Sequence, residues 1–131
     1  MSEQTERNID VIKKGYEAFA AGDLEGVMNL FDDNVEWTQP GESTISGTYH
    51  GKGEVVGYLT RLAEKSTTVT PVRFLADGDT VVVLSQISIG DERGEDADVF
   101  TLRDGKTIRA QIYTDTALME RMYGRKQVAR S

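Results

Sequence analysis

Two aspartates in the C-terminal third of the chain are the best candidates for chemistry. Side chains alternate between the two faces of an extended strand, so one predicted strand places Asp98 on the same face as Asp96. On the next predicted strand, Asp115 shares a face with Tyr113. A hairpin turn between these strands would let Asp98 and Asp115 approach each other across neighbouring positions.

Two carboxyl groups at short range in a pocket of low dielectric can perform acid–base chemistry. They cannot both ionise at low cost, so one pKa rises and the pair supplies one protonated acid and one base near neutral pH. One member then protonates a carbonyl, enolate or epoxide oxygen while the other removes a proton. The alternative is that both aspartates lie at strand ends in water, as most aspartates do.

Aromatic and imidazole side chains elsewhere could complete such a pocket. Tyr16 and Phe19 lie on the apolar face of the first predicted helix, where a core role is the alternative for Tyr16. Trp37 is predicted as a pocket wall or a core residue. His50 is the only histidine, and its unperturbed pKa lies near neutrality, although a surface or capping role is the alternative. Phe100 and Tyr113, which share strand faces with the candidate aspartates, are also predicted to line the pocket.

Three amphipathic helices are predicted in the N-terminal half of the chain. Apolar residues at helical spacing indicate the first from about 5 to 21, with Gly22 as a C-cap. Asp23 is well placed to cap a second, short helix that extends to Phe31. The third covers about 55–65 and follows a loop of small residues.

The remaining half of the chain is typical of strands joined by tight turns. Asp77-Gly78-Asp79 and Asp104-Gly105-Lys106 each predict a hairpin. Helices followed by long antiparallel strands indicate an α+β fold, with helices packed on one face of a sheet. The predicted strands are 35–38 in the first half, and then 67–76, 80–89, 97–103 and 108–116.

Length and composition narrow the class of protein. The 131 residues fit a single domain with a core at about 8–117 and a basic, solvated tail at 118–131. A net charge of −7 argues against nucleic acid and anionic membranes as partners. Without cysteine, disulfides and thiolate sites are excluded, and we expect no metal and no cofactor. The polar, acidic start and the lack of a long apolar run lead us to expect a cytoplasmic protein.

Short motifs along the chain occur in an order and spacing that is specific when they are taken together. The sequence resembles the SnoaL-like polyketide cyclases and their ketosteroid-isomerase relatives in the nuclear transport factor 2-like superfamily, over roughly residues 8–117. The motifs that carry the resemblance are Tyr16–Asp23, Leu30–Trp37, Gly47–Gly51, Phe74–Val82, Asp104–Arg109 and Tyr113–Asp115.

The resemblance implies a cystatin-like conical barrel, in which a strongly bent, mostly antiparallel sheet wraps around the helices and leaves a deep pocket. It also implies homodimers formed through the outer sheet face. One such fold hosts isomerases, cyclases, hydrolases, dehydratases and noncatalytic binders, so the fold alone does not set the activity.

Departures from the family patterns argue against two well-defined activities, epoxide hydrolysis with an arginine between two aspartates and steroid isomerisation with an aspartate base. Limonene epoxide hydrolases use an arginine and an aspartate two residues apart, with a second aspartate on the next strand; Asp96 replaces that arginine here, while Asp98 and Asp115 match the aspartates. Asp115 also matches the acid of SnoaL-type cyclases. Ketosteroid isomerases place an aspartate base before a proline, and here Gln39 precedes Pro40.

Two functions follow from these observations. The first is cofactor-independent acid–base catalysis on a small apolar molecule, of the cyclase, isomerase, dehydratase or hydrolase type, with Asp115 and Asp98 as the catalytic residues and Asp96 beside them. The resemblance further implies that Tyr16, near the position of the isomerases' oxyanion tyrosine, helps to polarise the substrate. The alternative is a noncatalytic module that binds a hydrophobic ligand or forms dimers.

Overall fold

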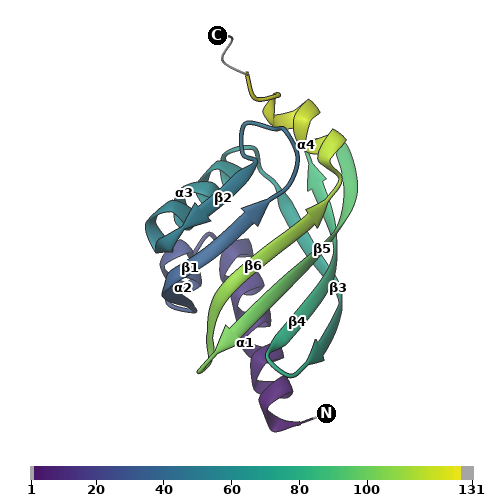
Figure 1. Cartoon of the computed structure of the whole chain (residues 1–131). Helices are drawn as coiled ribbons and strands as arrows, with labels where there is room; N and C mark the ends of the chain where they lie inside the picture. The colour runs from purple at the N-terminus through teal and green to yellow at the C-terminus, as the bar shows by residue number, and fades with distance from the viewer. Residues whose placement is uncertain (1, 128–131) are drawn as a thin grey trace.

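A computed structural model describes residues 2–127 of the chain. Helices α1 to α3 lie behind the sheet in the view of Figure 1, whereas α4 lies at one end of it. The elements are α1 (Glu3–Ala20), α2 (Leu24–Met28), β1 (Phe31–Gln39), β2 (Gly47–His50), α3 (Gly51–Glu64), β3 (Thr68–Asp77), β4 (Thr80–Ile89), β5 (Glu92–Arg103), β6 (Lys106–Thr114) and α4 (Thr116–Tyr123).

The six strands form one sheet in the order β2-β1-β6-β5-β4-β3. The β1–β6 pair is parallel and the other pairs are antiparallel. The sheet is strongly bent and wraps partly around α1 and α3 without closing into a complete barrel (Figure 1). The predicted α+β fold, with helices packed against a bent and mostly antiparallel sheet, is confirmed.

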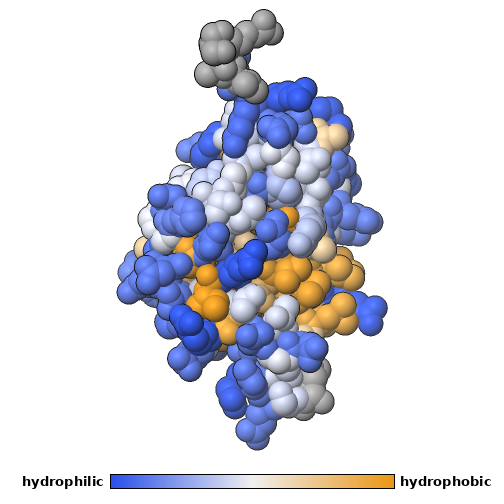
Figure 2. All heavy atoms as spheres, viewed as in Figure 1, coloured by the Kyte–Doolittle hydropathy of each residue, from blue (hydrophilic) through white to orange (hydrophobic). Residues whose placement is uncertain are grey.

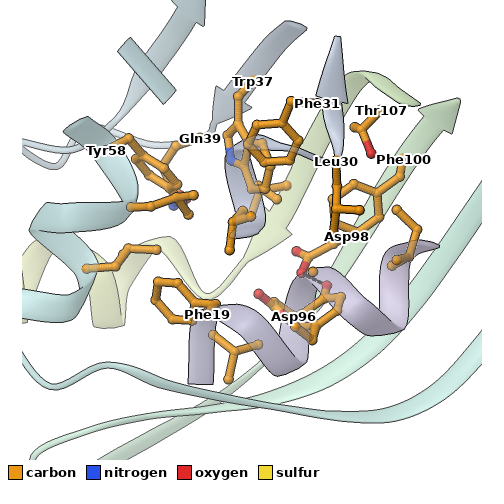
Figure 3. A pocket seen from close by; sticks show the side chains of 18 of the residues that line it. Phe19, Leu30, Phe31, Trp37, Gln39, Tyr58, Asp96, Asp98, Phe100 and Thr107 are labelled. Carbon is orange, nitrogen blue, oxygen red and sulfur yellow. Dashed lines mark hydrogen bonds between the residues drawn. The ribbon is translucent and has the colours of Figure 1, made fainter. Parts of the chain in front are cut away.

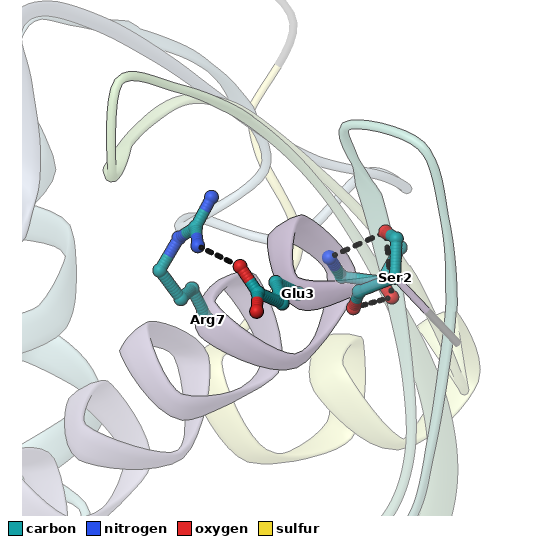
Figure 4. A network of polar contacts seen from close by, with 4 residues as sticks. Ser2, Glu3 and Arg7 are labelled. Carbon is teal, nitrogen blue, oxygen red and sulfur yellow. Dashed lines mark hydrogen bonds and ion pairs between the residues drawn. The ribbon is translucent and has the colours of Figure 1, made fainter.

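Helix α1 begins with a well-formed cap (Figure 4). The Ser2 hydroxyl oxygen accepts a hydrogen bond from the Thr5 backbone N–H at 3.2 Å, which satisfies one of the free donors of the first turn. Glu3 pairs with Arg7 at 3.7 Å, but both side chains are exposed, so the ion pair contributes little to stability. The inner side of α1 buries Ile9 and Ile12 against the sheet.

The inner face of the sheet supplies much of the core. Along β4, Val81, Val83, Ser85 and Ile87 are buried while the alternate residues Val82, Leu84 and Gln86 face outward, as the period of a half-buried strand requires. Ala110 and Ile112 form the inner face of β6. The central strands therefore present a mostly apolar inner face beneath α1 and α3, interrupted by Ser85 and Asp98.

A bulge changes the register of the β5–β6 hairpin. Leu102 pairs with Thr107 and Thr101 pairs with Arg109, so Ile108 is an extra residue in β6. Beyond this point the pairing brings Asp98 opposite Ile112. Since residues opposite each other share a face, the bulge sets which residues of β6 point inward.

Three sequence-based boundaries are corrected by the structure. Phe31 begins β1 and is not the end of the second helix. The predicted loop before the third helix contains β2, whose four residues pair with the end of β1; such a short strand has too few residues to show an alternating pattern. The predicted solvated tail contains α4, which buries Leu118 and Met119, while residues 128–131 of that tail lie outside the described part.

The outer face of the sheet carries several exposed apolar side chains. Figure 2 shows hydrophobic residues gathered over the area where β4, β5 and β6 lie. Leu84 and Tyr113, each opposite Ala97 in the ladder, are 38% and 58% exposed. Within residues 2–127, no helix combines the length and apolar character needed to cross a membrane.

Candidate active site

A cavity of about 90 Å³ lies between the inner face of the sheet and the helices. Its walls come from α1, α2, α3, the inner face of β1 and strands β3 to β6, and Met119 of α4 also contributes. Figure 3 shows this arrangement, with the carboxyl groups of Asp96 and Asp98 pointing toward the cavity among apolar side chains.

Asp98 is a buried carboxyl group on the inner face of β5, with 5% of its surface exposed. The Tyr16 hydroxyl of α1 donates a hydrogen bond to Asp98 Oδ2 at 2.5 Å. The other oxygen, Oδ1, is buried and has no hydrogen-bond partner among residues 2–127. Burial, and then the charge of nearby Asp96, raise the pKa of Asp98 well above its ordinary value. Asp98 therefore keeps its proton to a higher pH than an ordinary aspartate does.

Asp96 stands two residues before Asp98 and lines the same cavity. It is partly exposed, and burial raises its pKa from 3.8 to about 6. Its Oδ1 is buried without a hydrogen-bond partner in the described part of the chain. One face of β5 thus presents two carboxyl groups of different acidity, in which Asp98 is the buried member and Asp96 is the partly exposed member that can accept a proton.

Strand β1 forms the wall on the other side of the cavity. Trp37 and Gln39 both point inward and are buried, as alternation along the strand requires. Tyr58 of α3 donates a hydrogen bond from its hydroxyl to Gln39 Oε1 at 2.6 Å. The sequence does not predict Gln39 and Tyr58 as site residues, because Gln39 stands where ketosteroid isomerases have an aspartate base and an amide cannot act as a base.

Aromatic rings hold these groups in place. Phe100 packs edge-on against Tyr16 at 6.1 Å between ring centroids, and against Trp37 at 5.8 Å. Phe19 of α1 also lines the cavity. The predicted wall residues Tyr16, Trp37, Phe100 and Phe19 are thus brought together by three different elements.

Comparison with known proteins identifies the family. The SnoaL-like domain family matches residues 12–110, which includes most of the elements that build the cavity. The chain belongs to the SnoaL-like family. An uncharacterised protein of Mycobacterium tuberculosis (strain ATCC 25618 / H37Rv) is 27% identical over 122 residues, covering 86% of this chain and 93% of that protein.

Solved structures show the same SnoaL-like architecture. Bal32a from a soil-derived mobile gene cassette has a TM-score of 0.86 at 23% identity, covering 92% of this chain and 99% of that chain. TerC, co-crystallised with polyporic acid, has a TM-score of 0.80 at 26% identity, covering 89% of this chain and 98% of that chain. Members of this family are small-molecule pocket proteins, and the cavity is in keeping with that description.

The expected pairing of Asp98 with Asp115 is wrong for this SnoaL-like chain. Asp115 is exposed and serves as the N-cap of α4, where its Oδ1 accepts a hydrogen bond from the Leu118 backbone N–H at 3.0 Å. Tyr113 lies on the outer face of the sheet and does not line the cavity. The bulge at Ile108 is the cause, because it turns the face that includes Tyr113 outward.

His50 also lies outside the cavity. It is exposed and stands at the N-cap position of α3, where its side chain makes no capping hydrogen bond to the helix. Its backbone N–H donates to Glu54 Oε1 at 2.9 Å. The surface or capping alternative therefore describes the position of His50 better than the pocket role.

Within residues 2–127, no three carboxylate or imidazole side chains gather closely enough to hold a metal ion. The ionisable carboxyl groups of the cavity are Asp96 and Asp98. The arrangement can move a proton between these acids and a bound molecule, with Tyr16 assisting through Asp98.

Proposed function

We propose that this SnoaL-like protein catalyses cofactor-independent proton transfer on a small, largely apolar carbonyl compound. The observation that carries the proposal is the buried acid pair, in which Asp98 is held by Tyr16 and Asp96 lies two residues away on the same strand face. TerC, which was co-crystallised with polyporic acid, supports a cavity that accepts a small organic molecule.

The step is an enolisation in which Asp96 is the base and Asp98 the acid. Asp96 takes a proton from the carbon next to the carbonyl, and the electron pair of that C–H bond forms the C=C bond. The carbonyl oxygen takes the proton of Asp98, giving a neutral enol. Return of a proton to a carbon of the enol, at the original or another position, completes an isomerisation. Tyr16 keeps Asp98 oriented through the 2.5 Å hydrogen bond.

The size of the cavity limits the substrate. A cavity of about 150 Å³ accommodates benzene, whereas this one measures about 90 Å³. Molecules of about the size of a six-membered ring therefore require small movements of the lining side chains, and larger ones require larger movements.

Deuterium exchange tests the proposal without knowledge of the natural substrate. In D₂O, we expect the protein to accelerate exchange of the hydrogens next to the carbonyl of cyclopentanone or cyclohexanone above the protein-free rate, as followed by proton NMR. Asp115→Asn is the matched control, because the exposed Asp115 should leave the exchange rate unchanged.

The second candidate function, noncatalytic binding of a hydrophobic ligand, gives a different result in the same experiment. Chemical-shift changes on adding the ketones, without exchange above the protein-free rate, would favour binding. If Asp115→Asn lost the exchange activity while its fold stayed intact, Asp115 would be a catalytic residue. That result would contradict the assignment of catalysis to Asp96 and Asp98.

We also propose a second copy of the chain as the partner of the outer sheet face. Leu84 of β4 and Tyr113 of β6 are exposed there on either side of β5, beside half-buried Val82 and Val99, which gives an apolar surface. Light scattering should give a mass twice the 14.5 kDa of one chain, and Leu84→Glu should halve it. Thr60→Glu adds the same charge at an exposed position of α3 and should leave the mass unchanged. A wild-type mass of one chain would contradict the proposal.

A further inference from the structure

Strand β1 presents two buried N–H donors to the cavity. Trp37 is 8% exposed and Gln39 is 1% exposed, and both line the cavity. Trp37 Nε1 and Gln39 Nε2 are fully buried and have no hydrogen-bond partner among residues 2–127. A buried donor without an acceptor destabilises the folded chain, because the N–H loses its hydrogen bond to water and gains none in return. Two such donors on one strand face therefore favour a bound acceptor at this place.

Tyr58 fixes the direction of one of these donors. Its hydroxyl donates to Gln39 Oε1 at 2.6 Å, which leaves the Nε2 end of the same amide turned away from Tyr58. The Tyr58 ring packs against Trp37 at 5.9 Å between centroids and is itself buried. The donor pair is thus positioned by buried contacts from α3, as a preorganised binding site requires.

The donor pair lies across the cavity from the acid pair. Thr38 of β1 and Val99 of β5 both pair with Gln111 of β6. One residue further along, Gln39 and Asp98 therefore lie in the same row across the sheet, on either side of Ile112. Two strand spacings separate their backbones by about 10 Å. Since both side chains point into the cavity, a small ring can contact one with each end (Figure 3).

Charge selects a neutral ligand. Among the described residues, no Lys, Arg or His lines the cavity, and its ionisable carboxyl groups are Asp96 and Asp98. An anionic ligand would be desolvated beside these acids without a cation to balance it. A carbonyl or ether oxygen can accept from the donor pair without that cost.

We propose that Trp37 Nε1 and Gln39 Nε2 form a second oxygen-binding subsite, and that the substrate is a neutral compound with two acceptor oxygens separated by a short apolar segment. One oxygen is the carbonyl that faces Asp96 and Asp98, and the other accepts hydrogen bonds from the β1 donors. The choice of the reacting carbonyl rests on the proposed function, whereas the existence of the donor subsite does not.

Two ketones of equal size test the subsite. Tetrahydropyran-4-one differs from cyclohexanone in having an ether oxygen in place of the CH₂ group opposite the carbonyl. The wild-type protein should bind tetrahydropyran-4-one roughly three- to tenfold more tightly, as one or two net hydrogen bonds imply. NMR titration of the protein amide signals measures both dissociation constants.

Two variants remove the donors while they retain apolar volume. Trp37→Phe keeps an aromatic ring and Gln39→Met keeps the side-chain length. Each should reduce the preference while cyclohexanone still binds, and the double variant should reduce it to about onefold. Asp115→Asn is the matched control and should keep the wild-type preference. Thermal unfolding establishes that each variant is folded. Equal binding of the two ketones by the wild-type protein, or an unchanged preference in both donor variants, would overturn the subsite.

Deuterium exchange separates this inference from the proposed function. Exchange of both ketones without any preference between them in binding would retain Asp96 and Asp98 as the acid pair and reject the subsite. A binding preference that depends on Trp37 and Gln39, with no exchange of either ketone, would retain the subsite and reject catalysis.

Discussion

Replacing Asp96 with Asn is expected to lower the rate of ketone deuterium exchange by about 10²–10⁴-fold, because this is the range that a general base contributes. Asn has nearly the same shape but cannot accept a proton at neutral pH. The measurement is the exchange rate by proton NMR, compared with Asp115→Asn, which removes an exposed carboxylate outside the cavity. A rate close to wild type in Asp96→Asn would exclude Asp96 as the base.

The pH profile identifies the same group independently. Burial raises the pKa of Asp96 to about 6, so its base form accumulates above that pH and kcat/KM for exchange should rise through about pH 6. At higher pH the rate should fall when Asp98 loses its proton, because burial and the charge of Asp96 raise the pKa of Asp98 well above its ordinary value. The rising limb should disappear from the residual activity of Asp96→Asn. A profile that stays flat in the wild-type protein would contradict this assignment.

The pH dependence of the free energy of unfolding tests the raised pKa of Asp96 without any measurement of activity. Burial raises the folded-state pKa of Asp96 from 3.8 to about 6, so its protonated form stabilises the fold below about pH 4 and this contribution is lost as the pH rises through 6. The free energy of unfolding of wild type relative to Asp96→Asn should therefore fall by roughly 2 kcal/mol between pH 4 and pH 7. Urea unfolding at the two pH values measures it, and Asp96→Asn should remain folded at pH 7.

Replacing Phe100 with Ala is expected to lower the free energy of unfolding by about 3–5 kcal/mol. Phe100 is 5% exposed and packs against both Tyr16 and Trp37, so its loss removes the contact that joins α1 to β1 across β5. The neighbouring side chains cannot easily fill the volume that the Phe100 ring leaves, because a cavity already lies beside the ring. Urea unfolding with a common slope for both proteins gives the difference.

Val99→Ala is the neighbouring control for this prediction. Val99 lies on the opposite, outer face of β5 and is only half-buried, so its truncation should cost about 1 kcal/mol or less. If Phe100→Ala cost no more than Val99→Ala, the aromatic cluster would not be the structural frame of the site.

Part of the site follows directly from local sequence. Alternation along β5 is sufficient to place Asp98 and Phe100 on one inward face, because the strand is regular through that stretch. The helix face that carries Tyr16 is likewise a local property of apolar spacing. The fold class follows from the order of helices and strands, and the family from the order of short motifs.

The position of Asp115 could not be obtained in this way. A two-residue turn at Asp104-Gly105 without a bulge would place Asp98 opposite Gln111, whereas the structure pairs Asp98 with Ile112. The bulge depends on pairing between strands, which no local pattern records. The alternating apolar residues Ala110 and Ile112 were the available sign that their face, and not the face of Tyr113, points inward.

The polar wall of β1 was missed for a different reason. Gln39 has the chemistry of a hydrogen-bond donor, but its partner Tyr58 is 19 residues away on α3 and the contact exists only in the folded chain. The role of Gln39 therefore depends on what its amide can bind in the folded chain, and an amide in this place is not a base.

The extra residue at Ile108 has a consequence for how this cavity could change over time. Deleting one residue there would restore the regular hairpin register and exchange the two faces of β6 beyond it, placing Gln111 and Tyr113 inside and Ala110 and Ile112 outside. A single in-frame deletion could thus replace an apolar floor by an amide and a phenol, without any substitution. In a fold with this hairpin, short insertions and deletions are a route to new pocket chemistry that comparison of aligned residues alone would not reveal.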